Sequence, residues 1–454
     1  MGMLGDLLAH PEEFLPLCRM ALAAKQAAKL PKHPDLAFCY EMLNNVSRSF
    51  AVVIQQLPNP LRDAICIFYL VLRGLDTVED DMALDNDIKL PMLLVFHEKI
   101  YQKDFSMECG YKHYKKLMKE FGKVINVFLS LDKVFQIVIA DITKKMGAGM
   151  NEFIQKEVIT VADYNLYCHY VAGLVGIGLS QLFASSSLED SAVSKAEDLA
   201  NHMGLFLQKT NIIRDYLEDI IEEPAPRMFW PKAIWGQYGK SLEDFKESSN
   251  REGAVKCLNH MIVDALSHLP FCIQYMKQLR DRKVFRFCAI PQIMAAGTLA
   301  VCYNNGKVFE GVVKMRRGQT ACVFDKCEDM DDLLSWFVQF LDILRAKVDH
   351  EVAPSDPTAE LARKAISSNT HICQEELAKY KSLHPRSIVS HGKDILTVAV
   401  AAIYCYYSFG LGSGQLPDSL MTYSWLLKDY QQLHQALAAL LLLFAVSSTI
   451  LSSR

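Results

Sequence analysis

The sequence predicts an all-α protein, built as one large single-domain helical bundle with a central apolar cavity. Apolar residues recur at three- and four-residue steps through most of the 454 residues, which places them on one face of a helix. No long stretch alternates Val, Ile or Thr with polar residues between Asn-Gly turns, as β-hairpins do. Because 51% of the residues are hydrophobic, the chain can bury a large core, which excludes a disordered or collagen-like protein.

Three long helices are expected in the body of the bundle. They cover residues 62–80, 162–184 and 190–221, and the last is expected to break near Ser194. Each follows a proline or a polar cluster and is longer than the average globular helix of about 11 residues. Helices of this length suit a bundle whose centre holds a long apolar ligand.

Three apolar stretches are each either a buried core helix or a membrane span. Residues 287–303 contain Pro291 and Gln292, which favours a buried core helix over a membrane span. Residues 395–416 and 436–451 carry no charge. The apolar runs 395–411, which could extend to 416, and 436–451 are each close to the lower length limit for crossing a hydrocarbon layer of about 30 Å. We therefore expect a C-terminal membrane anchor of one or two spans. An apolar hairpin packed on the body is the alternative.

The chain is expected to divide into four regions. They are an N-terminal helical segment (1–30), a helical body (31–350), an amphipathic helix with its linker (351–392) and the anchor region (393–454). Basic residues precede the first expected span, which favours a cytosolic position for the body.

Charge and cysteine content exclude several classes of protein. Lys and Arg number 48 and Asp and Glu number 52, so the net charge of −4 gives no general attraction to nucleic acid. Any anion must then be held by locally placed Arg and Lys. The thirteen cysteines are scattered and include no C-x-x-C pair, which predicts a reduced, cytosol-facing chain without a zinc knuckle. The N-terminus fits no secretory signal.

One acidic pattern, D-x-x-E-D, occurs at 76–80 and again at 215–219. Positions i, i+3 and i+4 share one face of a helix, where three like charges repel one another and should raise some carboxylate pKa values. A divalent metal removes that penalty, and Mg²⁺ suits carboxylate ligands completed by water and substrate phosphate. Two such faces opposed across a bundle predict a site for a cluster of Mg²⁺ and a diphosphate.

Acidic triads also arise without a metal, and residues 325–329 match the same pattern. That copy is followed by more acidic residues and then an apolar run, so we expect it to complement a helix N-terminus. The first two copies differ because an Arg stands close by, Arg73 in one and Arg214 in the other. Together with Arg48, these are the local cations that a polyphosphate would need, although each alone is more often a surface residue.

Six stretches, spread over roughly residues 35–320, carry a resemblance to a known family: NNVSRSFAVVIQQLP, FYLVLRGLDTVEDD, YCHYVAGLVGIGLSQLF, LFLQKTNIIRDYLEDI, FCAIPQIMA and VVKMRRGQ. The chain resembles the head-to-head trans-prenyltransferases, the family of squalene, phytoene and dehydrosqualene synthases, and most closely the squalene synthases. It departs from their pattern after Gln319, and its C-terminus matches only as a hydrophobic anchor.

The resemblance implies an isoprenoid-synthase type of helical bundle and a two-step reaction. Two farnesyl diphosphates condense to presqualene diphosphate with Mg²⁺, and NADPH then reduces the product to squalene, the first committed step of sterol biosynthesis. It also implies an endoplasmic reticulum membrane protein whose catalytic domain faces the cytosol, and a monomer is expected.

The resemblance also implies roles for individual residues. The metal ligands would be Asp76, Glu79, Asp80, Asp215 and Asp219, and all of these but Glu79 are counted with Tyr167 as catalytic. The NADPH contacts would be Arg48, Arg73, Arg214, Lys314 and Arg316, with Ser47, Ser49 and Asn211 as neighbours. The substrate pocket would be lined by Phe50, Tyr69, Gln208, Phe287, Cys288 and Pro291.

Two of these assignments have simple physical content. A phenol has an unperturbed pKa near about 10, so Tyr167 is a poor base at neutral pH without help from a departing diphosphate or an Arg. Helix packing is the ordinary explanation for its spacing from neighbouring tyrosines. Lys314 and Arg316 flank Met315, so on an extended loop both would point to one side, toward a phosphate. A basic loop without a ligand is the alternative.

Three other functions remain open on the residues alone. A phytoene- or dehydrosqualene-type synthase would use the same carboxylates without NADPH. A Mg²⁺-dependent diphosphatase would release prenol without joining carbons. A non-catalytic, membrane-tethered helical scaffold would use its acidic clusters only to cap and solvate helices.

Overall fold

The computed structural model describes residues 9–222, 226–353 and 356–384, except for the side chains of Arg48 and Ser49. All regular structure in these ranges is helical, which confirms the all-α prediction. The longer helices are α2 (Phe14–Ala27), α3 (Pro34–Val46), α5 (Leu61–Asp80), α6 (Asn86–Lys99), α8 (Phe121–Ser130), α9 (Lys133–Phe153), α11 (Leu174–Ser185), α13 (Glu197–Arg214), α16 (Arg251–Leu266), α18 (Arg282–Cys302), α20 (Met330–Glu351) and α21 (Pro357–Leu383). The shorter α-helices are α4 (Arg48–Ile54), α7 (Lys112–Lys119), α10 (Val161–Cys168), α12 (Ser191–Lys195), α14 (Tyr216–Ile220), α15 (Lys232–Trp235), α17 (Leu269–Met276) and α19 (Arg317–Asp325).

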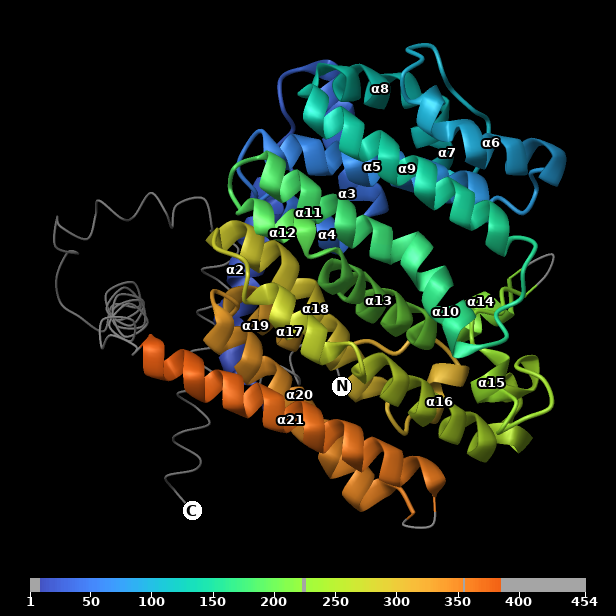
Figure 1. The fold of residues 1–454 in the computed structure, drawn as a ribbon, viewed down its shortest axis with the longest axis vertical. Helices are drawn as coiled ribbons and strands as arrows, with labels where there is room; N and C mark the ends of the chain where they lie inside the picture. The colour runs from blue at the N-terminus through green and yellow to red at the C-terminus, as the bar shows by residue number, and fades with distance from the viewer. Residues whose placement is uncertain (1–8, 223–225, 354–355, 385–454) are drawn as a thin grey trace, which may run out of the picture. The chain divides into compact units, whose positions relative to one another are not determined.

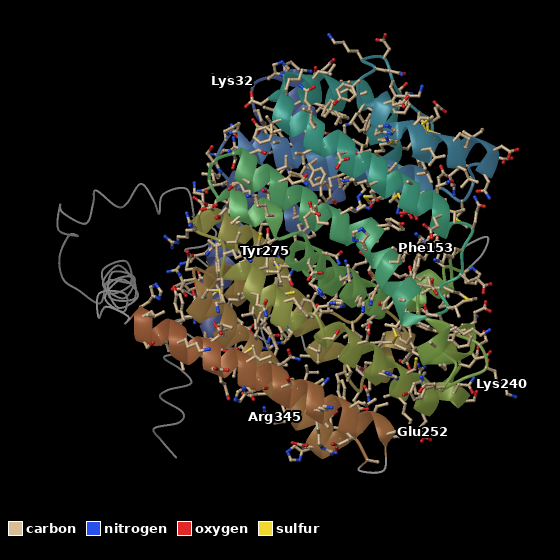
Figure 2. The ribbon with its side chains drawn as sticks, viewed as in Figure 1. Lys32, Phe153, Lys240, Glu252, Tyr275 and Arg345 are labelled. Carbon is tan, nitrogen blue, oxygen red and sulfur yellow. The ribbon has the colours of Figure 1, made fainter. Side chains whose placement is uncertain are left out.

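The core lies between helices that pack against one another in the order α5, α9, α11, α13, α18 and α20 (Figure 1). Phe68, Phe183 and Phe206, from three of these helices, are almost fully buried. Burying one such side chain contributes about 1.5–3 kcal/mol. Tyr275 lies among the central helices, whereas Glu252 lies at the periphery (Figure 2). The apolar periodicity of the sequence therefore corresponds to the buried faces of these helices.

Helix α5 agrees with the predicted helix at 62–80 to within one residue. It begins directly after Pro60 and ends where the backbone of Asp81 becomes extended. The Asp81 carboxylate accepts a hydrogen bond from the backbone N–H of Gly110 at 2.7 Å. Gly110 adopts a positive φ of 75°, and a Cβ there would lie 2.5 Å from the side chain of Thr77. The end of α5, which carries the first acidic motif, is therefore held by the loop before α7.

The predicted helix at 162–184 is present but is interrupted by a π-helical segment, η2 (His169–Gly173), between α10 and α11. The glycines of this region permit close packing on α13. A Cβ on Gly176 would lie 2.3 Å from the carbonyl oxygen of Ala200, and one on Gly204 would lie 2.3 Å from that of Ala172. Because neither position has room for a side chain, α11 and α13 approach each other closely.

The predicted helix at 190–221 breaks twice. The first break, at Ala196, is close to the one expected near Ser194. The second was not predicted and falls at Asp215, whose φ of −94° and ψ of 14° separate α13 from α14. The second acidic motif therefore begins at a helix junction and does not lie on one continuous helix.

Residues 287–302 belong to α18 and Tyr303 directly follows it, which confirms the prediction of a core helix. Among the described residues, two helices are long and apolar enough to cross a membrane, Arg282–Cys302 and Val161–Ser185, and 78% and 50% of their apolar windows are buried within the protein. Gln292 donates a hydrogen bond to the backbone oxygen of Met203 at 3.0 Å, so the polar residue within α18 is satisfied.

The described residues up to Tyr380 belong to one compact unit. The expected membrane spans at 395–416 and 436–451 lie outside the described residues. The twelve cysteines within the described residues are all free thiols.

Candidate active site

Both acidic motifs line one pocket with a volume of about 300 Å³. The first motif reaches it from the end of α5, and the second reaches it from the junction of α13 and α14. We call it the acid pocket, and its charged and aromatic lining consists of Arg73, Asp76, Glu79, Asp80, Tyr167, Asp215, Asp219, Arg227 and Phe229. The structure thus brings together the five carboxylates that the sequence singled out.

Three arginines contact these carboxylates. Arg73 lies 3.3 Å from Asp76, and Arg214 donates to its neighbour Asp215 through Nε at 2.7 Å. Arg227 lies 2.6 Å from Asp80, and its backbone N–H donates to the backbone oxygen of Asp219 at 2.8 Å. Arg227 therefore links the first acidic motif to the second.

The surroundings of the acid pocket raise the pKa of three carboxylates, those of Asp76, Glu79 and Asp219. Burial raises the pKa of Asp76 to about 6, while Arg73 opposes the rise. Burial raises the pKa of Asp219 to about 7, with Arg227 opposing the rise. Burial and the charge of Asp80 raise the pKa of Glu79. When such neighbouring carboxylates are ionised they repel one another, and a bound cation would remove this repulsion.

The donor set of the acid pocket fits a divalent cation that prefers oxygen ligands. Five carboxylate groups line this pocket, and it also contains the amide side chains of Gln208 and Asn211. Such hard oxygen donors are the ligands that Mg²⁺ takes, with water and phosphate completing its octahedral shell.

The Glu of the second motif takes no part in this pocket. Glu218 is solvent-exposed and does not line the acid pocket, whereas Asp215 and Asp219 do. Glu218 and Asp219 are neighbours in α14, after the break at Asp215, and of these two only Asp219 lines the pocket.

The third copy of the pattern, at 325–329, is structural as expected. The side chain of Asp329 accepts the backbone N–H of Asp332 and caps α20. Asp325 pairs with Arg19 at 2.9 Å, and Glu328 pairs with two arginines of α18. A shared sequence pattern therefore serves two different purposes in this chain.

Tyr167 lies in the acid pocket, with its ring stacked on Phe229 at a centroid distance of 4.6 Å and an interplanar angle of 15°. The guanidinium of Arg227 lies 4.9 Å from the centre of the same Phe229 ring. Burial, with the charge of Glu79 adding to it, raises the pKa of Tyr167 well above its usual value. Tyr167 is therefore a neutral phenol at physiological pH.

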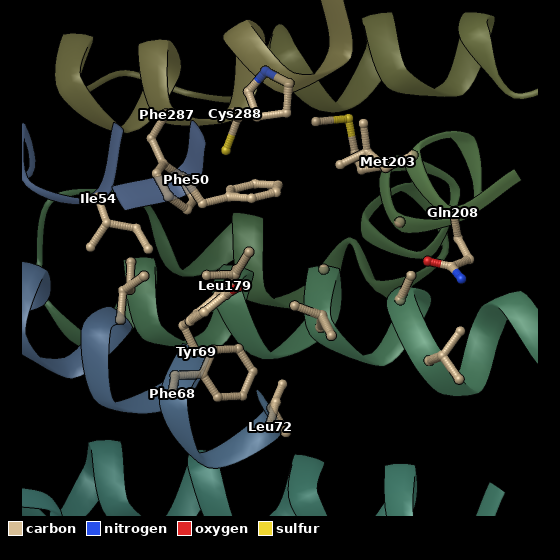
Figure 3. A pocket seen from close by; sticks show the side chains of 18 of the residues that line it. Phe50, Ile54, Phe68, Tyr69, Leu72, Leu179, Met203, Gln208, Phe287 and Cys288 are labelled. Atoms are coloured by element: carbon tan, nitrogen blue, oxygen red, sulfur yellow. The ribbon is translucent and has the colours of Figure 1, made fainter. Parts of the chain in front are cut away.

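An apolar cavity of about 260 Å³ adjoins the acid pocket and is lined mainly by α5, α11, α13 and α18 (Figure 3). Figure 3 shows Gln208 at one end and Ile54, Phe68 and Phe287 toward the other. All six residues predicted for the substrate pocket line this apolar cavity: Phe50, Tyr69, Gln208, Phe287, Cys288 and Pro291. It shares Arg73, Asp76, Val171, Gln208 and Asn211 with the acid pocket.

A third space, which we call the basic cavity, has a volume of about 750 Å³. Among the residues expected to contact NADPH, it is lined by Ser47, Asn211, Arg214 and Lys314. None of the described residues that line it is acidic. The Ser47 hydroxyl is buried without a hydrogen-bond partner, which a polar group of a bound ligand would supply. These features fit a phosphorylated nucleotide.

The other expected NADPH contacts are placed differently. Arg73 lines the acid pocket and the apolar cavity. Arg316 does not line the basic cavity, because its guanidinium turns to Glu13 of the N-terminal segment, 2.8 Å away. Lys314 and Arg316 are both exposed and flank the buried Met315, and their pointing to one side stays a prediction. Arg48 and Ser49 belong to α4, and their side chains lie outside the described residues.

Sequence reasoning missed several residues at these sites. Arg227 and Phe229 follow the prolines after α14, in a stretch without periodicity, so no local pattern marked them. Lys89 donates from Nζ to the backbone oxygen of Glu79 at 2.9 Å and reaches the first motif from α6. Lys112 and Tyr114 line the basic cavity, and the positive φ of 48° at Lys112 is visible only in the structure.

Comparison with known proteins agrees with this architecture. Residues 43–319 match the sequence model of the squalene/phytoene synthase family. Squalene synthase LSS of Botryococcus braunii is 53% identical over 415 residues, covering 90% of each chain, and squalene synthase 1 of Panax ginseng is 52% identical, covering 90% of this chain and 99% of its own. The solved complex of TcSQS with the ligand E5700 is 44% identical, with a TM-score of 0.73 over 75% of this chain and 99% of that one. The chain therefore belongs to the squalene/phytoene synthase family, within it to the squalene synthases, and is an enzyme of the prenyltransferase type.

Proposed function

We propose that the protein joins two molecules of farnesyl diphosphate head to head into presqualene diphosphate and then reduces this product to squalene with NADPH. The observation that carries the proposal is that the acid pocket and the apolar cavity share a wall that includes Asp76 and Asn211. A substrate with a diphosphate head and a long apolar tail fits two adjoining spaces of these polarities.

The acid pocket would act on the diphosphate. We propose that Mg²⁺ is held there by Asp76, Glu79, Asp80, Asp215 and Asp219, and that bound Mg²⁺ offsets the charge of the departing diphosphate. Arg73 and Arg227 already lie among these carboxylates and stay charged at any physiological pH. Their guanidinium groups would bind diphosphate oxygens and hold the leaving group in place.

Tyr167 would move the proton that is lost when the cyclopropane ring closes. Because its phenol is neutral, it cannot be a free base, so it would pass its own proton to the released diphosphate as it accepts one from the substrate. Phe229 fixes the plane of the Tyr167 ring by stacking and presents no nucleophile to a carbocation.

The basic cavity would hold NADPH, which supplies the reducing equivalent for the second step. Its three described cations, Lys112, Arg214 and Lys314, would bind phosphate groups. The basic and apolar cavities share Phe50 and Pro291, so a reductant in one lies beside a prenyl chain in the other. This adjacency favours a reductive second step over the phytoene-type alternative.

Product analysis tests the proposal. Purified protein with Mg²⁺ and farnesyl diphosphate should accumulate presqualene diphosphate and convert it to squalene when NADPH is added. A C30 product with one more double bond than squalene, formed despite NADPH, would select the phytoene- or dehydrosqualene-type reaction, and prenol without coupling would select a diphosphatase. No turnover by folded protein would select the scaffold.

We also propose that residues 393–454 anchor the enzyme in the endoplasmic reticulum membrane, with the catalytic domain in the cytosol and the protein a monomer. The charge-free stretches 395–416 and 436–451 support an anchor. Expression without residues 393–454 should move the protein from the membrane fraction to the soluble fraction. Continued membrane sedimentation of this shortened protein would contradict the proposal.

A further inference from the structure

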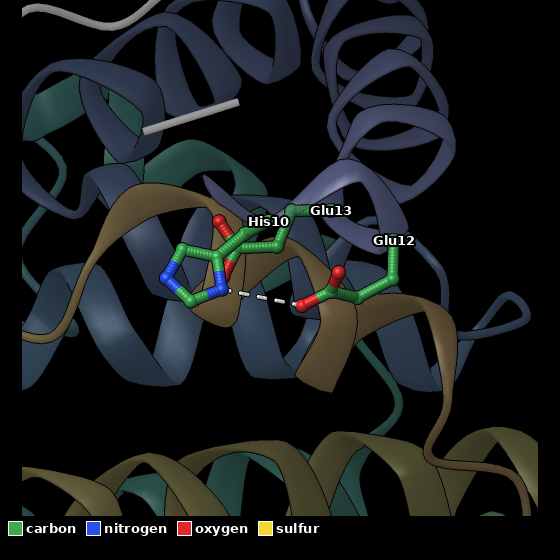
Figure 4. Close-up of side chains that lie close together, drawn as sticks. All are labelled: His10, Glu12 and Glu13. Atoms are coloured by element: carbon green, nitrogen blue, oxygen red, sulfur yellow. Dashed lines mark ion pairs between the residues drawn. The ribbon is translucent and has the colours of Figure 1, made fainter. Parts of the chain in front are cut away.

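The N-terminal segment contacts Arg316, which lies two residues after Lys314, a residue in the lining of the basic cavity. Nη2 of Arg316 donates to Oε1 of Glu13 at 2.8 Å, and the same guanidinium contacts His10. His10, Glu12 and Glu13 gather at the start of the N-terminal segment (Figure 4), where His10 also pairs with Glu12 at 3.3 Å. Residues 9–27 lie outside the 43–319 region that the family model covers.

Glu13 is built into the protein although it lies near the chain start. It is 4% exposed, whereas its neighbour Glu12 is solvent-exposed. A Cβ on Gly318 would lie 1.7 Å from Oε2 of Glu13, so the carboxylate occupies the space that this glycine leaves free. Burial of the Glu13 carboxylate requires a charged partner, and Arg316 supplies it.

Two further contacts fix the positions of the N-terminal segment and of the loop at residues 314–316. Arg19 of α2 forms a two-fold hydrogen bond with Asp325 at the end of α19, at 2.9 and 3.0 Å. Met315 is buried against Gly297 of α18, where a Cβ would lie 2.5 Å from its sulfur. Three consecutive residues therefore have fixed directions, because Lys314 lines the basic cavity, Met315 enters the core and Arg316 meets Glu13.

We propose that Glu13 is a positioning residue for the nucleotide site and that it acts by holding the guanidinium of Arg316 next to Lys314 for contact with a phosphate of NADPH. The proposal rests on the proposed function. A guanidinium has five N–H donors, so its pair with Glu13 leaves donors for a phosphate. Release of Arg316 would leave a buried carboxylate unpaired, which is costly, so the pair persists when the nucleotide binds.

The two half-reactions allow a sharp test in the full-length enzyme. Formation of presqualene diphosphate is measured without NADPH, and conversion of isolated presqualene diphosphate to squalene is measured over a range of NADPH concentrations. In Glu13→Gln, KM for NADPH should rise about tenfold with kcat retained, the loss expected for a weakened charge-assisted contact. The rate of presqualene diphosphate formation should not change. Gly318→Ala, which displaces the Glu13 carboxylate, should shift KM in the same direction.

Controls separate positioning from general stability. Glu12→Gln, one residue away and exposed, should leave KM unchanged. Arg316→Gln should raise KM, and adding Glu13→Gln to it should raise KM no further, because the two residues act through one contact. A fall in KM for Glu13→Gln would show that Glu13 competes with phosphate and would overturn the proposal. Additive effects or an equal loss in both half-reactions would also overturn it. If the unmodified enzyme makes no squalene with NADPH, the proposed function itself fails.

Discussion

Arg227 and Asp80 are 147 positions apart in the chain and form an ion pair of 2.6 Å. Because the backbone N–H of Arg227 also donates to the backbone oxygen of Asp219, one residue connects the two acidic motifs. This bridge sets the two groups of carboxylates around a shared pocket. The chemistry proposed above depends on that arrangement, and five predictions follow from it and from the surrounding packing.

Asp219→Asn should lower the rate of presqualene diphosphate formation by about 100- to 1,000-fold, the usual size of losing one charge-stabilising group. The fold should persist, because Asp219 faces a pocket and Asn has nearly the same shape. The matched control is Glu218→Gln, from the same motif, whose side chain does not line the acid pocket and whose rate should stay near that of the unmodified enzyme. Equal losses in both variants would exclude the acid pocket as the distinguishing feature.

Metal binding should strengthen as the pH rises. Burial raises the pKa of Asp76 to about 6 and that of Asp219 to about 7, so between pH 6 and 8 protons compete with Mg²⁺ for these groups. The Mg²⁺ concentration for half-maximal activity should therefore fall over this range. An activation constant that does not depend on pH would contradict the prediction.

The same pKa values set the direction of the stability change in the metal-free protein. A carboxylate whose pKa is higher in the folded state binds more protons folded than unfolded, so the free energy of unfolding decreases as the pH rises from about 4 to 7. In the presence of a chelator, this contribution lowers Tm across that window. Mg²⁺ should then raise Tm more at pH 7.5 than at pH 5.5 in calorimetry. Mg²⁺ stabilisation that is larger at pH 5.5 would show the wrong sign.

Tyr167→Phe should slow presqualene diphosphate formation by about 100-fold or more, as loss of a proton-transfer group does. The stacking on Phe229 needs only the ring, so Tm should change little. Tyr164→Phe is the control, because the Tyr164 hydroxyl is buried without a partner and lies outside the acid pocket. Full activity in Tyr167→Phe would remove the phenol from the mechanism.

Gly176→Ala should destabilise the protein by about 1–3 kcal/mol, the usual cost of overpacking. Its new methyl group would lie 2.3 Å from the carbonyl oxygen of Ala200 and would force α11 away from α13. Gly311→Ala is the control, because a Cβ there meets nothing within 4 Å. Denaturant unfolding measures both, and similar stability for the two variants would show that the close approach is not required.

Local patterns predicted the helices well, because the spacing of apolar residues reports directly which face of a helix is buried. The helix at 62–80 and the core helix at 287–303 are correct, and the break near Ser194 falls two residues from the observed one. The break at Asp215 was missed because no Pro or Gly marks it. The helical pattern continues through it, and only the packed structure shows the change of direction.

The order of residues was by itself enough to determine an all-helical chain and to single out two acidic motifs, because both properties depend on neighbours a few positions apart. Folding in three dimensions decided which of those acids share a pocket, that Glu218 faces away, that Arg227 joins the motifs and that Arg316 turns to Glu13. These relationships link residues distant along the chain, and their meeting depends on how the helices pack and where they break.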